Sequence, residues 1–166
     1  TKINDKVLNA LEKFDSVHIV ASIDGVGKHN NYLRYGSDWS IVEDNFKKFQ
    51  SMPNVRLSIG YILQHSSVYT LQNVIEFANA NDIKIWMSEV YDDTGYLGIN
   101  SVVSEDADRA KSQLDYCTDE QKKTVQCWLD SYYFDAKLHQ KYTEYVKTLD
   151  SIRGTDFVKT FNPSWT

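Results

Sequence analysis

Apolar residues occupy both faces of a short run, residues 17–24, and the run turns polar only at its end. Alternation divides the run into two faces, Val17, Ile19, Ala21 and Ile23 on one and His18, Val20, Ser22 and Asp24 on the other. A run that stays apolar on both faces until Ser22 and Asp24 is typical of a parallel strand buried on both sides, with polar groups at its carboxyl end.

Two later segments, 55–63 and 83–90, also alternate and are predicted to be strands. In the first, Val55, Leu57, Ile59 and Tyr61 form the apolar set. If this set packs on helices, Ser58 and Gly60 point to the opposite side, as Ser22 and Asp24 do in the first strand.

Helical spacing of apolar residues appears between and after these strands. It predicts helices over residues 3–14, over 39–49 with Ser37 or Asp38 as the cap, and from Ser66 or Ser67 to about Ala78. Two further helical regions, 104–115 and 118–150, follow, and the second contains a break. Thr118 and Gln121 have the spacing of a capping box, and Arg153-Gly154 ends the helical part, before a short aromatic tail.

Helices that connect successive strands imply parallel pairing with right-handed connections. The sequence therefore predicts an α/β fold with three parallel strands in chain order, at 17–24, 55–63 and 83–90. Residues 1–92 form this sheet with its helices, and residues 93–166 form a mostly helical extension packed on it. The sheet edges left exposed by only three strands favour a homodimer through one of them.

Composition narrows the class of partner. The 166 residues carry a net charge of −5, which argues against a broad basic face for nucleic acid or for an anionic membrane. Neither an apolar run of 18 residues nor a signal-peptide pattern is present, so we expect a cytoplasmic protein. The Asp92-Asp93 pair suits a metal ion or a loop turn, and we expect the turn and no metal site.

The segment between the first strand and the next helix, residues 25–38, is long enough to suggest function. Its beginning has two interpretations. Asp24 and Gly25 either make a turn that leads into the next helix, or Asp24 belongs to a site at the carboxyl end of the sheet.

The ordered set of Ser-Ile-Asp-Gly (22–25), Tyr-Leu-Arg-Tyr-Gly (32–36) and the helix from Trp39 resembles the middle of radical S-adenosylmethionine enzymes. The similar branch carries a SPASM or twitch extension. The resemblance covers residues 3–90 and continues more loosely through the C-terminal helices. It implies strands four, five and six of a partial (β/α)6 barrel, with helices on the outside.

The chain departs from that family in two respects. It contains two cysteines, Cys117 and Cys127, and no CxxxCxxC motif, so it lacks the three thiolates that hold the 4Fe–4S cluster in the family. No two glycines are adjacent, so the Gly-Gly-Glu type of turn is also missing. Either the chain is the C-terminal part of a longer protein, or it is a relative without the cluster. We expect no cluster or cofactor bound to this chain alone.

The resemblance implies S-adenosylmethionine contacts at the ends of the strands. Its candidate residues are Ser22, Asp24, Arg34, Ser58, Gly60 and Ser88. Asp24 suits ribose hydroxyls or an ammonium group, and Arg34 suits the cofactor carboxylate. Each has a structural alternative: Arg34 pairs with Asp38 or caps a helix, and Gly60 allows a helix to pack closely on its strand.

Three functions remain open at this point. By resemblance, the full-length protein uses a 4Fe–4S cluster and S-adenosylmethionine to make a 5′-deoxyadenosyl radical, which acts on an unknown peptide or small molecule. The alternative is a cluster-free α/β module that binds a ligand or a protein. A barrel hydrolase that uses Asp24 and Glu89 is the third, although the sequence offers no nucleophile–base pair for it.

Overall fold

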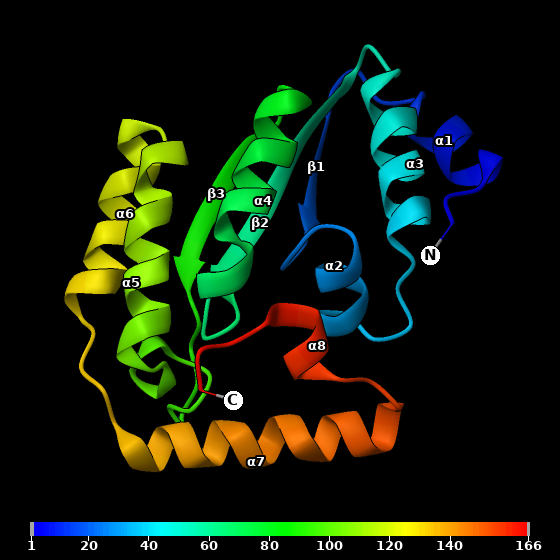
Figure 1. Ribbon diagram of the computed structural model, residues 1–166. Helices are drawn as coiled ribbons and strands as arrows, with labels where there is room; N and C mark the ends of the chain where they lie inside the picture. Colours follow the sequence, from blue (N-terminus) through cyan, green and yellow to red (C-terminus); the bar gives the residue numbers. More distant parts are fainter. Residues whose placement is uncertain (1, 166) are drawn as a thin grey trace.

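The computed structural model describes residues 2–165 and contains three strands with helices between and after them (Figure 1). The elements are, in chain order, α1 (Asp5–Leu11), β1 (Val17–Ser22), α2 (Lys28–Leu33), α3 (Trp39–Gln50), β2 (Val55–Leu63), α4 (Ser67–Ala80), β3 (Lys84–Glu89), η1 (Ile99–Ser101), α5 (Ser104–Ser112), η2 (Gln113–Tyr116), α6 (Asp119–Asp130), α7 (Ala136–Arg153) and α8 (Phe157–Phe161).

The three strands form one parallel sheet in the order β1-β2-β3. The α/β class and the parallel pairing in chain order are therefore confirmed. The register aligns Ser22 with Gly60 and Gly60 with Trp86, and it aligns Val20 with Ser58 and Ser58 with Lys84. Each of these rows lies on one face of the sheet, because paired residues in a sheet point the same way.

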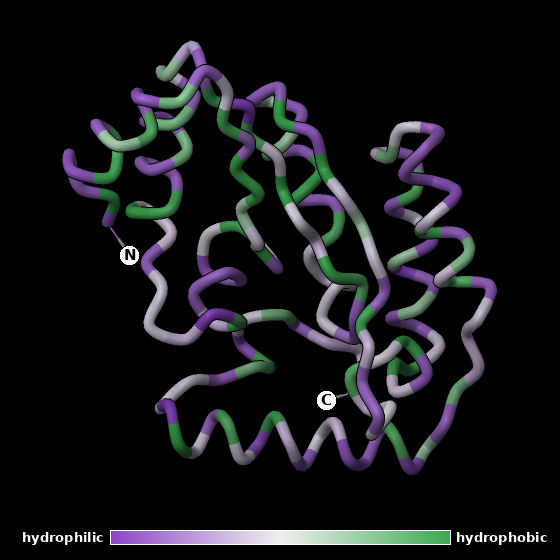
Figure 2. Tube along the Cα trace, turned by 180° about the vertical axis from the view of Figure 1, so that it is seen from behind, coloured by the Kyte–Doolittle hydropathy of each residue, from purple (hydrophilic) through white to green (hydrophobic). Residues whose placement is uncertain are grey.

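Only one face of the sheet is covered by helices (Figure 1). The side chains of Ile59, Tyr61 and Leu63 on that face are completely buried. On the other face, Val20 is 53% exposed and Trp86 is 50% exposed, and Figure 2 views the strands from this side. The expectation of burial on both faces is wrong for the chain described here, because the connecting helices α3 and α4 lie on the same side.

The C-terminal helices extend the helical layer and then turn across the end of the sheet. α5 packs on α4, and α6 runs alongside β3. α7 crosses below the carboxyl ends of the strands, and α8 fills the space between α7 and α2 (Figure 1). One continuous hydrophobic core joins the sheet to these helices, from Ile23 and Ile59 to Trp128 and Phe157.

Two short helices lie where the sequence predicts irregular structure. α2 occupies part of the loop expected over 25–38, and α8 occupies the C-terminal tail. β1 ends at Ser22, so Asp24 follows the strand. The break expected in the second helical region separates α6 from α7. No helix within residues 2–165 is both long enough and apolar enough to span a membrane.

Candidate functional site

Four of the six candidate residues lie on the bare face of the sheet. Ser22, Gly60 and Ser88 occupy its carboxyl half, and Ser58 lies one row further back, between Val20 and Lys84. Ser22 and Ser88 are exposed, so their hydroxyl groups are accessible to a ligand on this face. The alternation therefore places Ser22 away from the helical layer.

Ser58 and Gly60 already have close neighbours within the sheet. Ser58 is 2% exposed, and its Oγ lies 2.8 Å from His18 Nε2. A Cβ added to Gly60 would lie 3.3 Å from Val20 Cγ1 and 3.7 Å from Ser22 Oγ. The close neighbour of Gly60 is thus β1 and not a helix. Both residues contribute to packing and hydrogen bonding across the bare face.

Asp24 and Arg34 form an ion pair at the carboxyl end of β1. Arg34 Nε lies 3.0 Å from Asp24 Oδ2, and the Asp24 side chain is 14% exposed. The alternative partner Asp38 instead caps α3 by accepting a hydrogen bond from the Ser40 backbone N–H. Asp24 Oδ1 accepts no hydrogen bond within residues 2–165, so this carboxylate can still bind a donor.

A cavity of about 190 Å³ opens beside Asp24, between the ends of β1 and β2 and the helix α7. Its polar lining consists of Asp24, Tyr32, Gln64, His65, Ser66, Tyr142, Tyr145 and Arg153. Ligand sites of open α/β sheets form in this position, outside the carboxyl ends of the strands. The sequence did not identify His65, Tyr142 or Arg153 as lining residues. Tyr142 and Arg153 belong to α7, which only the tertiary fold brings to this edge, whereas the position of His65 just after β2 is a local signal that could have indicated it.

His65 is the most unusual residue in the cavity lining. It is 1% exposed and stacks on Tyr142, with 3.4 Å between the ring centroids. Its Nδ1 lies 2.6 Å from Ser101 Oγ, and Ser101 Oγ donates its proton to the Gly98 carbonyl. Nδ1–H must therefore donate to Ser101, which leaves Nε2 as an acceptor in the neutral ring.

Nε2 of His65 is buried and has no hydrogen-bond partner within the described residues. Burial holds the pKa of this imidazole well below its usual value, and the nearby His139 lowers it further. A neutral buried acceptor without a partner is uncommon in folded proteins, and it marks a position where a water or a ligand donor would be stabilised.

Asp92, the candidate for a metal ligand, has a structural role in a turn. Asp92 Oδ1 accepts hydrogen bonds from the backbone and side chain of Thr94, which confirms the loop turn. Within residues 2–165 there is no cluster of three His, Cys, Asp or Glu side chains that could hold a metal ion. Cys117 is buried and Cys127 is exposed, and two thiols cannot supply the three ligands of a 4Fe–4S cluster.

No family model matches this chain, and no curated protein or solved structure shows significant similarity to it.

Proposed function

We propose that the chain is the C-terminal part of a radical S-adenosylmethionine enzyme and forms the last three strands of its partial barrel. The observation that carries this proposal is the sheet itself, which is parallel, helix-covered on one face and bare on the other. In a (β/α) barrel every helix lies outside and the strands line the interior. A bare face with exposed Val20, Trp86 and Ser22 suits such an interior.

The free edge of β1 supports the same proposal. The backbone N–H groups of Val17 and Ile23 point toward β2, Val17 donating to the Asn54 carbonyl just before that strand and Ile23 to the Gly60 carbonyl. The alternate residues of β1, at 18, 20 and 22, therefore direct their N–H groups away from the sheet. Those groups have no backbone partner within residues 2–165. A preceding parallel strand, supplied by a longer chain, would pair with them and extend the barrel.

Residues at the carboxyl end of β1 suit the polar parts of S-adenosylmethionine. Asp24 has a free carboxylate oxygen, Arg34 offers a guanidinium at its rim, and Ser22 offers an exposed hydroxyl. When bound, the cofactor and its cluster supply the 5′-deoxyadenosyl radical. The residues of this chain would only bind and orient the cofactor, because the cluster ligands must come from elsewhere in the protein.

The coding sequence upstream of Thr1 tests this proposal directly. We expect it to encode a CxxxCxxC motif and three further strands with their helices. A reading frame that starts immediately before Thr1, or one without the cysteine motif, would overturn the proposal. The second candidate, a cluster-free α/β interaction module, would then be favoured by the same free edge and bare face.

Replacement of Asp24 tests the binding site. In the reconstituted full-length protein, Asp24→Ala removes a charged acceptor, and we expect S-adenosylmethionine affinity to fall by roughly 1.5–3 kcal/mol, or about ten- to a hundredfold. Isothermal titration measures the change. Asp44→Ala removes an exposed carboxylate that pairs with Lys48 on α3, and it should leave the affinity unchanged. Equal affinity of Asp24→Ala and the wild type would show that Asp24 serves only the turn.

A further inference from the structure

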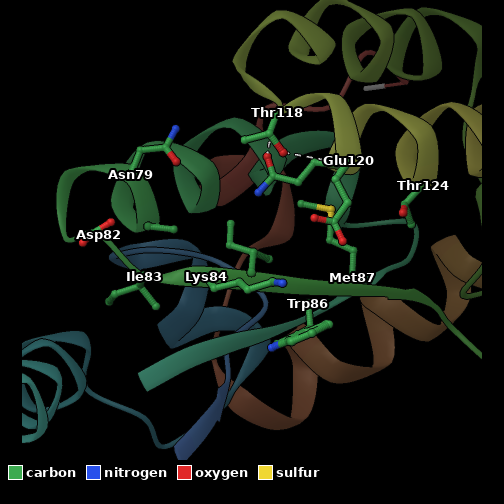
Figure 3. A pocket seen from close by; sticks show the side chains of 12 residues that line it. Asn79, Asp82, Ile83, Lys84, Trp86, Met87, Thr118, Glu120 and Thr124 are labelled. Carbon is green, nitrogen blue, oxygen red and sulfur yellow. Dashed lines mark hydrogen bonds between the residues drawn. The ribbon is translucent and has the colours of Figure 1, made fainter. Parts of the chain in front are cut away.

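A second and larger groove lies beside β3, away from the site described above (Figure 3). Its volume is about 570 Å³. One wall is β3, the opposite wall is the first two turns of α6, and the end of α4 closes one end. Its lining includes Asp82, Ile85, Met87 and Glu120.

The groove opens onto the backbone of β3. Five consecutive residues, 83–87, contribute to its wall, although successive side chains of a strand point to opposite faces. A groove that is lined by residues from both faces of the strand must run along the edge of the strand. Among residues 2–165, β3 pairs with β2 alone, so its other edge carries no strand.

The hydrogen-bond pattern identifies the free backbone groups. Val90 donates its backbone N–H to the Leu63 carbonyl of β2. Every second residue of a strand directs its backbone groups to the same side, so Ser88, Trp86 and Lys84 also direct theirs toward β2. Ile85 and Met87 therefore direct their N–H and C=O groups into the groove. Nothing within residues 2–165 forms a hydrogen bond with these four groups. Edge groups of this kind are a template for another strand.

We propose that this groove binds an extended peptide segment, which pairs with Ile85 and Met87 as a fourth strand and directs a basic side chain toward Glu120 on the α6 wall. Addition of a strand to an exposed sheet edge is an established mode of peptide recognition. The inference does not depend on the proposed enzymatic function, since it involves none of the cofactor-binding candidates.

The charges in the groove determine the kind of peptide. Asp82 and Glu120 are exposed carboxylates with no ion pair within the described residues; Glu120 stands on the α6 wall, near Met87, and Asp82 at the end that α4 closes (Figure 3). The one basic lining residue, Lys84, has its Nζ 4.1 Å from the ring centroid of Trp86 and is engaged there. The free charge facing the groove is therefore negative, which favours lysine or arginine in the bound segment.

The shape of the groove favours a single segment over a folded domain. α6 stands alongside β3 and forms the outer wall of the groove. β3 of a second copy carries its own α6 in the same position, so it cannot enter the space that one extended strand fills. A linear peptide, or a disordered tail of another protein, has no such obstruction.

Titration with synthetic peptides tests the inference. The probe is the acetylated and amidated peptide Val-Thr-Val-Lys-Val-Thr-Val, added to the ¹⁵N-labelled 166-residue chain. We expect saturable shifts of the Ile85 and Met87 amide signals, and at least about fivefold weaker binding when glutamate replaces the lysine. Two peptides N-methylated at alternate residues, one in each frame, provide the control. The peptide methylated on the N–H groups that face β3 should not bind, because those donors are blocked. The peptide methylated on the other set of N–H groups should still bind.

Two variants of Met87 separate the backbone from the side chain. Met87→Pro removes the outward N–H without breaking a bond to β2, because proline is tolerated on an edge strand at such positions. We expect the peptide affinity to fall at least about tenfold in Met87→Pro, since a paired backbone donor is lost. Met87→Ala keeps this donor and should bind the peptide as the wild type does. Thermal unfolding checks that both variants fold. If Met87→Pro does not fold, the comparison of the two N-methylated peptides on the wild-type chain tests the backbone pairing. The proposal is overturned by the absence of saturable shifts up to about 1 mM peptide, or by equal binding of both N-methylated frames.

Discussion

Asp106 shows how a single buried carboxylate holds the C-terminal segment against the helical layer. It is completely buried and accepts a hydrogen bond from the Tyr69 hydroxyl at 2.7 Å. It also accepts one from the Ser164 hydroxyl at 2.7 Å and another from the Ser164 backbone N–H. α4, α5 and the end of the chain are thereby joined at one side chain.

Removal of this carboxylate should destabilise the protein strongly. Asp106→Ala removes the acceptor of three hydrogen bonds and leaves the buried Tyr69 hydroxyl without its partner, and we expect the free energy of unfolding to fall by about 2–4 kcal/mol. Urea denaturation measures the loss. The matched control is Asp108→Ala on the same helix, where an exposed carboxylate pairs with Lys111 and its removal should cost less than about 1 kcal/mol. Similar losses for the two variants would contradict the anchoring role of Asp106.

His65 should give the protein a pH-dependent stability. Its folded-state pKa is depressed by burial, so below the unfolded value of about 6.5 the unfolded state binds a proton that the folded state does not. Stability then rises with pH, and the contribution of His65 is lost as the pH falls. Between pH 7 and pH 5 we expect this residue to remove up to about 2 kcal/mol.

The variant His65→Gln isolates this effect, because glutamine does not titrate. Its unfolding free energy should differ from that of the wild type by a constant above pH 7, which reflects the lost stacking on Tyr142. Below pH 6 the difference should shift in favour of the variant. Denaturation at a series of pH values provides the measurement, and parallel pH profiles for the two proteins would rule out the neutral buried state of His65.

At the scale of elements, local signals account for the helices that have strong caps. Thr118 accepts a hydrogen bond from the Gln121 backbone N–H, and the Gln121 side chain accepts one from the Thr118 N–H, so the capping box is confirmed. Gly154 adopts φ 65° and ends α7, as the sequence predicts. Asp38 caps α3 in the same local manner.

Thr118→Ala should destabilise α6 selectively. Loss of the cap typically costs about 1 kcal/mol, while Thr118→Ser keeps the hydroxyl acceptor and should preserve stability. Hydrogen exchange of the first-turn amides of α6 reports the local effect, and thermal unfolding reports the total. Equal protection in the alanine and serine variants would mean that packing against the helical layer, and not the cap, fixes the start of α6.

The two missed helices, α2 and α8, are short and depend on distant partners. α2 has 6 residues and α8 has 5, fewer than an isolated helix needs to be stable. Tyr32 of α2 donates its hydroxyl to Asp150 of α7, and Phe157 of α8 donates its N–H to the same carboxylate. Asp150 thus stabilises both helices from a third element, which no local pattern could indicate.

At the scale of the whole molecule, the free edge of β1 should drive self-association of the isolated chain. The outward N–H and C=O groups of His18, Val20 and Ser22 are available to a second copy. We expect sedimentation velocity to detect a dimer whose population rises with concentration.

A pair of variants tests which edge is responsible. Val20→Pro removes an outward N–H of β1 and should shift the equilibrium to monomer, whereas Val20→Ala keeps that donor and should preserve the dimer. A monodisperse monomer for the wild type over the full concentration range would refute the association. A dimer unaffected by Val20→Pro would place the interface elsewhere.

The sequence by itself determined the strands, their parallel order, the caps of α3 and α6, and the end of α7, whereas the cap expected at Ser66 or Ser67 forms no side-chain bond to α4. Each of these follows from side-chain alternation, helical spacing or contacts within a few residues, all of which are local. It also placed Ser22, Ser58, Gly60 and Ser88 on a common face, because strand periodicity fixes which residues point the same way.

The tertiary structure alone decided which surfaces remain open and which distant groups meet. It left one face of the sheet bare, since α3 and α4 lie on the other. It brought α7 to the carboxyl ends of the strands, so that His65 stacks on Tyr142 beside Asp24. It set α6 alongside β3 and formed the groove between them. These features depend on packing between segments far apart in the chain, for which a single sequence carries no local signal.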